Sequence, residues 1–248
     1  MKIREFYCFD IERKRRFIKS FLAKMNLNYE TQIFKENGYK GVNFLIKKFK
    51  RQDRPNIVVT AHYDGIGAYD NSGGSVGLMW LIKWMQLDKL KLLKDKFGII
   101  PVFTDAEERK VIGVKYLLKH KILKKIPIYG HIALDGFGIG CSIGGFWNLR
   151  NLYARLNSYS RVIPMPIKGE STIFQSKGIF SVHVFSLPSQ QLNGLIKRNI
   201  FPDTWKIVHT KKDNLELVTE EILPFMIYNL YNKITEIDFK KQGIFKIF

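Results

Sequence analysis

Acidic residues and histidines stand in five short motifs that could together hold metal ions and move protons. In chain order the motifs are His62-Tyr63-Asp64, Asp70-Asn71, Asp105-Ala106-Glu107-Glu108, Asp135-Gly136 and His209-Thr210-Lys211-Lys212-Asp213. Any one of them alone is more often structural, because an acid can simply favour a helix start and a His-x-Asp pair can be an ordinary hydrogen bond. Taken together they are more specific, because carboxylates gathered in one buried place repel one another and call for a cation. Two histidines and three carboxylates suit two zinc ions that share a bridging carboxylate.

The elements that must position these motifs read as strands alternating with helices. Continuous apolar runs, typical of strands buried on both faces, occupy residues 56–61, 97–103, 128–134 and 180–187. Helical patterns occupy residues 11–25, 77–87, 107–120 and 219–237. Two further strands, 29–35 and 41–49, flank an Asn-Gly turn that is typical of a hairpin.

This alternation predicts an α/β fold of three layers, α/β/α, with a mainly parallel mixed central sheet. Motifs follow the first three apolar strands directly, so we expect them to meet at the carboxyl ends of the sheet. Pro101 stands near the end of the second apolar strand and predicts a bend or a sheet edge there.

The order and strand context of these motifs resemble the M28 family of zinc aminopeptidases. The family pattern runs His-x-Asp, Asp-Asn-x-Ser-Gly, Glu-Glu-x-Gly-Leu, Asp-x-x-Gly and a terminal His-Thr-x-x-Asp, and the match extends from about Gly41 to the end of the sequence. The resemblance implies two Zn²⁺ ions, and such sites also accept Co²⁺ or Mn²⁺. It implies the following ligands: His62 and Asp135 for one ion, Glu108 and His209 for the other, and Asp70 for both.

The same resemblance assigns roles to three further acids. Glu107 matches the family's general base, which takes a proton from the attacking water. Asp64 matches the acid that orients His62 and fixes its tautomer. Asp213 is expected to act in the same way near His209.

The chain departs from the family pattern at positions around the motifs. Gly73 replaces a serine, and Arg109 and Lys110 stand where small or apolar residues are commoner. Glu170 lies in a loop that reads Ser-Asp-His in the family, which changes the expected substrate contacts. Val208 occupies a place where some members carry a tyrosine that polarises the substrate carbonyl.

Three other side chains call for ordinary interpretations. His131 and His183 lie within apolar strands and are expected to be hydrogen-bonded core residues. Trp205 is expected to form a wall of the cleft.

The composition is strongly basic, with 41 lysines and arginines against 22 acids and a formal net charge of +19. Such a charge is typical of nucleic-acid-binding proteins. Here the basic residues are spread along the chain, and no zinc finger, RNA-recognition signature or helix-turn-helix pattern accompanies them. We therefore do not expect a nucleic-acid partner, and the positive surface is instead expected to attract acidic peptides.

The sequence offers no apolar run near the ~20 residues that a membrane span requires. The run Arg13-Lys14-Arg15-Arg16 stands where a secretory signal would be apolar, and two cysteines give no disulfide framework. These features predict a cytoplasmic protein without membrane contact.

The sequence therefore predicts one zinc-peptidase domain over residues 1–248, with an N-terminal helix and the start of an edge hairpin in 1–40 and the family-like region in 41–248. The expected function is an aminopeptidase that acts on peptides with a free N-terminus. A glutaminyl-cyclase-like or other amide-acting enzyme is the first alternative. Such relatives generally use one zinc, whereas the intact His62 and the bridging Asp70 favour a two-metal hydrolase. A non-catalytic basic binding module is the second alternative. The retention of Glu107 together with all five ligands argues against it.

Overall fold

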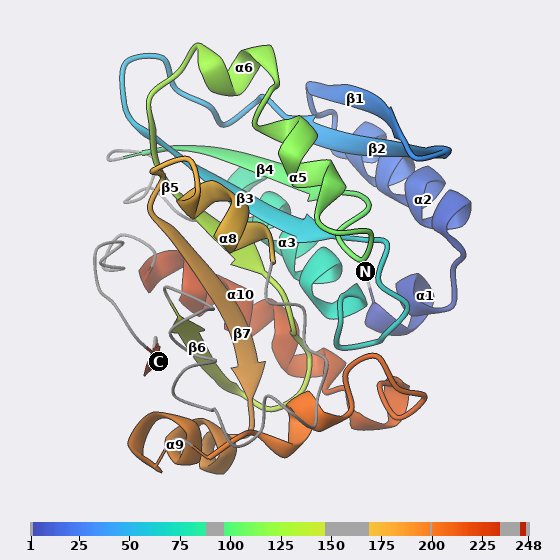
Figure 1. Ribbon diagram of the computed structural model, residues 1–248, viewed down its shortest axis with the longest axis vertical. Coiled ribbons are helices and arrows are strands. Elements are labelled where there is room, and N and C mark those ends of the chain that lie inside the picture. Colours follow the sequence, from blue (N-terminus) through green and yellow to red (C-terminus); the bar gives the residue numbers. More distant parts are fainter. Residues whose placement is uncertain (1, 88–96, 147–168, 199, 234–243, 247–248) are drawn as a thin grey trace.

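The computed structural model describes residues 2–87, 97–146, 169–198, 200–233 and 244–246 (Figure 1). Its strands are β1 (Tyr29–Glu36), β2 (Tyr39–Ile46), β3 (Asn56–His62), β4 (Gly98–Thr104), β5 (Ile128–Leu134), β6 (Ser142–Phe146), β7 (Ser181–Leu187) and β8 (Ile244–Lys246). Its α-helices are α1 (Ile3–Tyr7), α2 (Ile11–Lys24), α3 (Ser72–Gln86), α5 (Ile112–Leu117), α6 (Lys121–Lys124), α8 (Glu170–Gln175), α9 (Ser189–Arg198) and α10 (Leu223–Lys233). Short 3₁₀ helices lie at Asp203–Lys206, Leu215–Leu217 and Glu220–Ile222.

The strands form an eight-stranded sheet in the order β1-β2-β4-β3-β5-β7-β6-β8. The inner strands β4, β3, β5 and β7 are parallel, and antiparallel pairs complete both margins. The parallel strands end at the same edge of the sheet (Figure 1). The predicted three-layer fold with a mixed sheet is confirmed.

Helices cover both faces of this sheet (Figure 1). Alternate residues of β3 join different cores: Ile57 and Val59 pack with residues of α1, α2, α3 and α10, whereas Val58 packs with residues of α5, α6 and α8. Every residue of β3 is therefore buried. This explains why the strand reads as a continuous apolar run rather than as an alternating one.

The hairpin at the sheet margin follows the sequence closely. β1 pairs with β2 as far as Glu36 and Tyr39, and the two residues between them, Asn37 and Gly38, have φ angles of 50° and 76°. Two left-handed residues are what a tight two-residue hairpin turn requires.

Pro101 does not mark a sheet edge, because β4 lies between β2 and β3. β2 pairs with β4 only at Val102 and Phe103. The antiparallel ladder thus begins just after the proline, which has no N–H to donate to it.

The starts of α3 and of the last helix differ from the prediction. α3 begins at Ser72 rather than at residue 77, because the Asn71 side chain caps it by accepting the N–H of Gly74 at 2.9 Å. The last helix begins as a 3₁₀ turn and becomes α-helical only at Leu223, and its predicted end at 237 lies outside the described residues. No helix in the described ranges is long and apolar enough to cross a membrane.

Candidate metal centre

The predicted ligands meet at the edge where the parallel strands end. His62 is the last residue of β3, and Asp135 comes directly after β5. Asp70 lies between β3 and α3, and Glu108 lies in the loop after β4. His209 approaches from the C-terminal part of the chain, after the first 3₁₀ helix.

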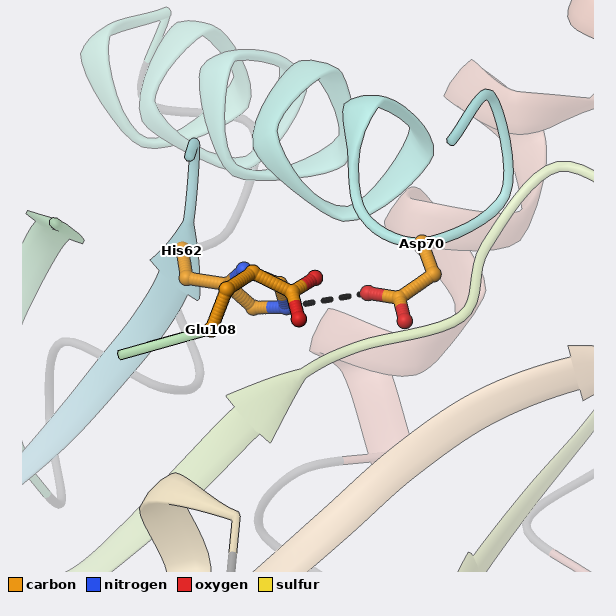
Figure 2. A group of neighbouring side chains, drawn as sticks. All are labelled: His62, Asp70 and Glu108. Atoms are coloured by element: carbon orange, nitrogen blue, oxygen red, sulfur yellow. Dashed lines mark ion pairs between the residues drawn. The ribbon is translucent and has the colours of Figure 1, made fainter. Parts of the chain in front are cut away.

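Asp70 stands at the centre of this group. Its Oδ1 lies 3.1 Å from Nε2 of His62, and its Oδ2 lies 3.0 Å from Nε2 of His209. Figure 2 shows the Asp70 carboxylate directed at the His62 ring, with Glu108 beside that ring. A carboxylate that offers one oxygen to each of two histidines has the arrangement of a bridging ligand.

Each histidine also faces a second carboxylate. Nε2 of His62 lies 3.4 Å from Oδ1 of Asp135, and Nε2 of His209 lies 3.3 Å from Oε2 of Glu108. Ligand atoms of His62, Asp70 and Glu108 all lie within 4.8 Å of one another. The structure thus brings the five predicted ligands together as two halves that share Asp70.

Asp64 contacts His62 on the side of the ring that faces away from the other predicted ligands. Its Oδ1 lies 3.3 Å from Nδ1 of His62, so the other ring nitrogen faces the cluster. The same carboxylate accepts the backbone N–H groups of Glu107 at 3.1 Å and Glu108 at 3.2 Å. Asp64 therefore contacts His62 as expected, and it also holds the loop that carries both glutamates, which the sequence did not indicate.

The helix predicted over residues 107–120 begins only at Ile112. The loop before it contains left-handed residues, with φ angles of 57° at Ala106 and at Val111. Non-glycine residues rarely adopt this conformation, and it is enriched at functional sites. These left-handed residues explain the difference, because a right-handed helix cannot run through Lys110 and Val111, and α5 begins directly after them.

The electrostatics of the cluster favour added positive charge. Burial opposes ionisation of Asp70, but the His209 hydrogen bond and the His62 ring outweigh it and hold the pKa of Asp70 below its ordinary value. Asp70 and Glu108 raise the pKa of His209 to about 11. Burial raises the pKa of Glu107 well above its ordinary value, and nearby carboxylates add to that effect against the opposing His62 ring. The cluster therefore attracts protons or metal cations.

The geometry around Asp70 Oδ1 is compatible with a metal ion. This buried oxygen has no hydrogen-bond donor among the described residues, even though Nε2 of His62 is only 3.1 Å away. A carboxylate oxygen and a neutral ring nitrogen each have a lone pair that can bind a cation placed between them. Nitrogen and oxygen donors of this kind suit zinc, cobalt or manganese.

Helix α2 holds the loop after β3 and the loop after β4 in place, a role that the sequence did not indicate. Lys14 is buried and donates from Nζ to the carbonyl oxygen of Gly65 at 2.6 Å. Arg15 donates to Oδ2 of Asp105 at 2.6 Å. The fully buried Asp105 carboxylate accepts four further hydrogen bonds, from the hydroxyls of Tyr39 and Tyr63 and the N–H groups of Val42 and Ala106.

Two expectations about the surroundings are wrong. Asp213 accepts the backbone N–H groups of Tyr69 at 2.7 Å and Asp70 at 3.1 Å, so it fixes the backbone of the bridging residue rather than the His209 ring. Trp205 is only 4% exposed and packs against Phe185 and other aromatic residues in the core, so it is not a cleft wall.

A buried polar network lies beneath the cluster. Glu170 accepts hydrogen bonds from the hydroxyls of Thr60 and Thr104, and burial raises the pKa of Glu170 to about 7. His131 contacts Thr60 through Nε2 at 2.8 Å and Ser181 through Nδ1 at 2.6 Å. His131 is therefore a hydrogen-bonded core residue as expected, and Glu170 faces the interior rather than solvent.

A pocket of about 470 Å³ opens beside the His209 half of the cluster. We call it the rim pocket, and the residues that line it include Ile11, Tyr39, Ile66, Glu108, Arg109 and His209. A molecule in this pocket would lie against two of the predicted ligands.

Comparison with known proteins identifies a peptidase family. The model of the family described as peptidase family M28 matches residues 45–224. No curated protein matches the sequence significantly.

Solved structures share the fold at low sequence identity. The LapA aminopeptidase of Legionella pneumophila is 18% identical with a TM-score of 0.58, over 89% of this chain and 62% of LapA. BSAP, a zinc aminopeptidase from Bacillus subtilis, is 20% identical with a TM-score of 0.53, over 81% of this chain and 51% of BSAP. A glutaminyl cyclase from Fimbriiglobus ruber is 14% identical with a TM-score of 0.64, over 93% of this chain and 91% of the cyclase. The chain thus spans less than two thirds of LapA and BSAP.

Proposed function

The chain belongs to peptidase family M28, and on this basis we propose that it is a zinc aminopeptidase that removes N-terminal residues from peptides. The observation that carries the proposal is the position of Asp70, whose two oxygens face the two histidines at 3.1 and 3.0 Å. Two complete halves that share one carboxylate favour two ions over one.

The proposed division between two ions follows the family resemblance and is supported by the second carboxylate that faces each histidine. His62 and Asp135 would hold one ion, Glu108 and His209 the other, and Asp70 both. When bound, such ions polarise the scissile carbonyl and lower the pKa of a water molecule. Each ion would keep an open position, because three protein ligands leave room for water or substrate.

Glu107 is the residue proposed to move the proton. Its side chain is only 7% exposed and lies next to a proposed ligand without belonging to either half. The positive charge of bound ions would favour the ionised form of Glu107, and its carboxylate would then accept the proton of the attacking water and pass it to the nitrogen of the leaving amine. Asp64 holds the Glu107 backbone N–H at 3.1 Å, which keeps the general base in a fixed place during both transfers.

A glutaminyl cyclase is the second candidate, because the F. ruber cyclase structure is covered almost over its whole length. In that reaction the N-terminal amine attacks the side-chain amide of glutamine. A new C–N bond closes the ring, the amide C–N bond breaks, and Glu107 would carry the proton from the amine to the departing ammonia. No peptide bond is cleaved.

The two candidates give different products from the same peptides. Zinc-loaded protein is incubated with Leu- and Gln-initiated peptides and with their N-acetylated forms, and the products are read by mass spectrometry. Release of free amino acids from the unblocked peptides, lost after chelation and in Glu107→Gln, supports the aminopeptidase. Loss of ammonia from the Gln peptide with all peptide bonds intact supports the cyclase and contradicts the aminopeptidase.

A further inference from the structure

Arg109 lines the rim pocket as a positioned cation without an acidic partner. Its guanidinium lies 4.5 Å from the centre of the Tyr39 ring, within the range of a cation–π contact. Among the described residues it forms no ion pair, although Glu108 is its neighbour in the chain.

Tyr39 gives Arg109 a fixed platform. The Tyr39 hydroxyl donates to Oδ1 of Asp105 at 2.7 Å, and Arg15 donates to the same hydroxyl at 3.3 Å. Asp105 is fully buried and bonded from several sides. An arginine stacked on such a ring loses little side-chain freedom when it binds an anion, so its affinity for a carboxylate is enhanced.

The two carboxylates that line the pocket, Glu108 and Asp64, already have partners other than Arg109. Glu108 lies 3.3 Å from Nε2 of His209, and both oxygens of Asp64 accept backbone N–H groups. Arg109 therefore has room for a carboxylate that the chain itself does not supply.

The remaining walls are apolar. Ile66 is 82% exposed, and Ile11 lines the same pocket. A ligand with an aliphatic stem and a terminal carboxylate would bury the stem against these isoleucines and pair the carboxylate with Arg109.

We propose that the rim pocket receives the side chain of a glutamate or aspartate next to the scissile bond and that Arg109 selects it. This rests on the proposed peptidase function, because the pocket matters for specificity only if Glu108 and His209 belong to the catalytic centre. A bidentate arginine–carboxylate pair is expected to favour the acid over the matching amide by about 10-fold or more in kcat/KM.

Matched peptides test this preference at each position. Wild type, Arg109→Gln, Arg109→Glu and the neighbouring control Lys110→Gln are assayed on peptides that carry Glu or Gln at the first or at the second position, in an otherwise neutral sequence. The Glu-to-Gln ratio of kcat/KM is expected to exceed one at one of the two positions. It should fall to about one in Arg109→Gln and below one in Arg109→Glu, and Lys110→Gln should keep the wild-type ratio.

The outcomes separate this proposal from the one on which it rests. Hydrolysis of neutral peptides with a Glu-to-Gln ratio near one at both positions overturns the role of Arg109 and leaves the peptidase function standing. A preference that persists in Arg109→Glu, or that Lys110→Gln abolishes equally, also overturns it. Absence of all peptide hydrolysis overturns both proposals together.

Discussion

Replacing Asp105 by alanine is expected to lower the free energy of unfolding by about 4 kcal/mol. The Asp105 side chain is fully buried, and its partner Arg15 is only 12% exposed. Removing one partner of a buried ion pair costs about 3–5 kcal/mol, and without Asp105 the Arg15 guanidinium keeps Glu12 as its acidic partner, whose side chain is exposed. The Tyr39 hydroxyl also loses its acceptor, which adds to the loss, whereas the Tyr63 hydroxyl keeps the carbonyl oxygen of Val42 at 2.6 Å.

Arg15 itself offers a matched control. It also pairs with Glu12 through its other terminal nitrogen, and the Glu12 side chain is 63% exposed. An exposed pair contributes about 0–1 kcal/mol, so Glu12→Ala should leave stability nearly unchanged. The double variant of Arg15 and Asp105 should lose less than the sum of the two single variants, because no unpaired charge remains.

Urea unfolding of chelated protein, followed by circular dichroism, measures these differences. Chelation removes any contribution from bound metal, so the readout concerns the ion pair alone. If Asp105→Ala lies within 1 kcal/mol of wild type, or if Glu12→Ala costs as much, then α2 does not brace the loop before Glu107 in the way described.

Two further predictions concern the acids of the site. Glu107→Gln should keep the zinc content of wild type, measured by plasma mass spectrometry, and lose at least about 100-fold in kcat; an active variant contradicts the role of Glu107. Burial raises the pKa of Glu170 from an ordinary 4.5 to about 7. Between these two pH values the folded chain keeps a proton on Glu170 that the unfolded chain has lost. Stability is therefore lost as the pH rises through this interval, by up to about 3 kcal/mol in total. Urea unfolding of chelated protein at pH 5 and pH 8 should show this loss in wild type and not in Glu170→Gln, and equal losses in both contradict it.

The sequence predicted the part of the site that depends on strand ends. His62 and Asp135 close apolar strands, and parallel strands end at one edge, so their meeting follows from the fold class. The hairpin at Asn37-Gly38 followed equally well, because its local chemistry permits few alternatives.

The residues that hold the loops of the site in place act through tertiary contacts, and the sequence did not predict them. Lys14 and Arg15 lie in a basic run, and helical periodicity alone does not show that these two side chains point inward toward buried acceptors. Asp213 stands four residues after His209, yet it bonds the backbone near Asp70. Its acceptor atoms are matched to N–H groups far away in the sequence, which no local pattern records.

The loop after β4 shows the same limit of local patterns. Residues 107–111 fit a helical pattern, but Asp64 takes up the N–H groups of Glu107 and Glu108 from another loop. The left-handed residues Lys110 and Val111 then keep this stretch out of a right-handed helix, and no local pattern records them.

The pairing of two ions across Asp70 is tested most directly by a crystal structure of the zinc-loaded protein, with anomalous difference maps collected on both sides of the zinc absorption edge. Two zinc peaks are expected, one between His62 and Asp135 and one between Glu108 and His209, with one oxygen of Asp70 toward each. A single peak on one side of Asp70, or no peak among these five residues, would contradict the two-ion centre.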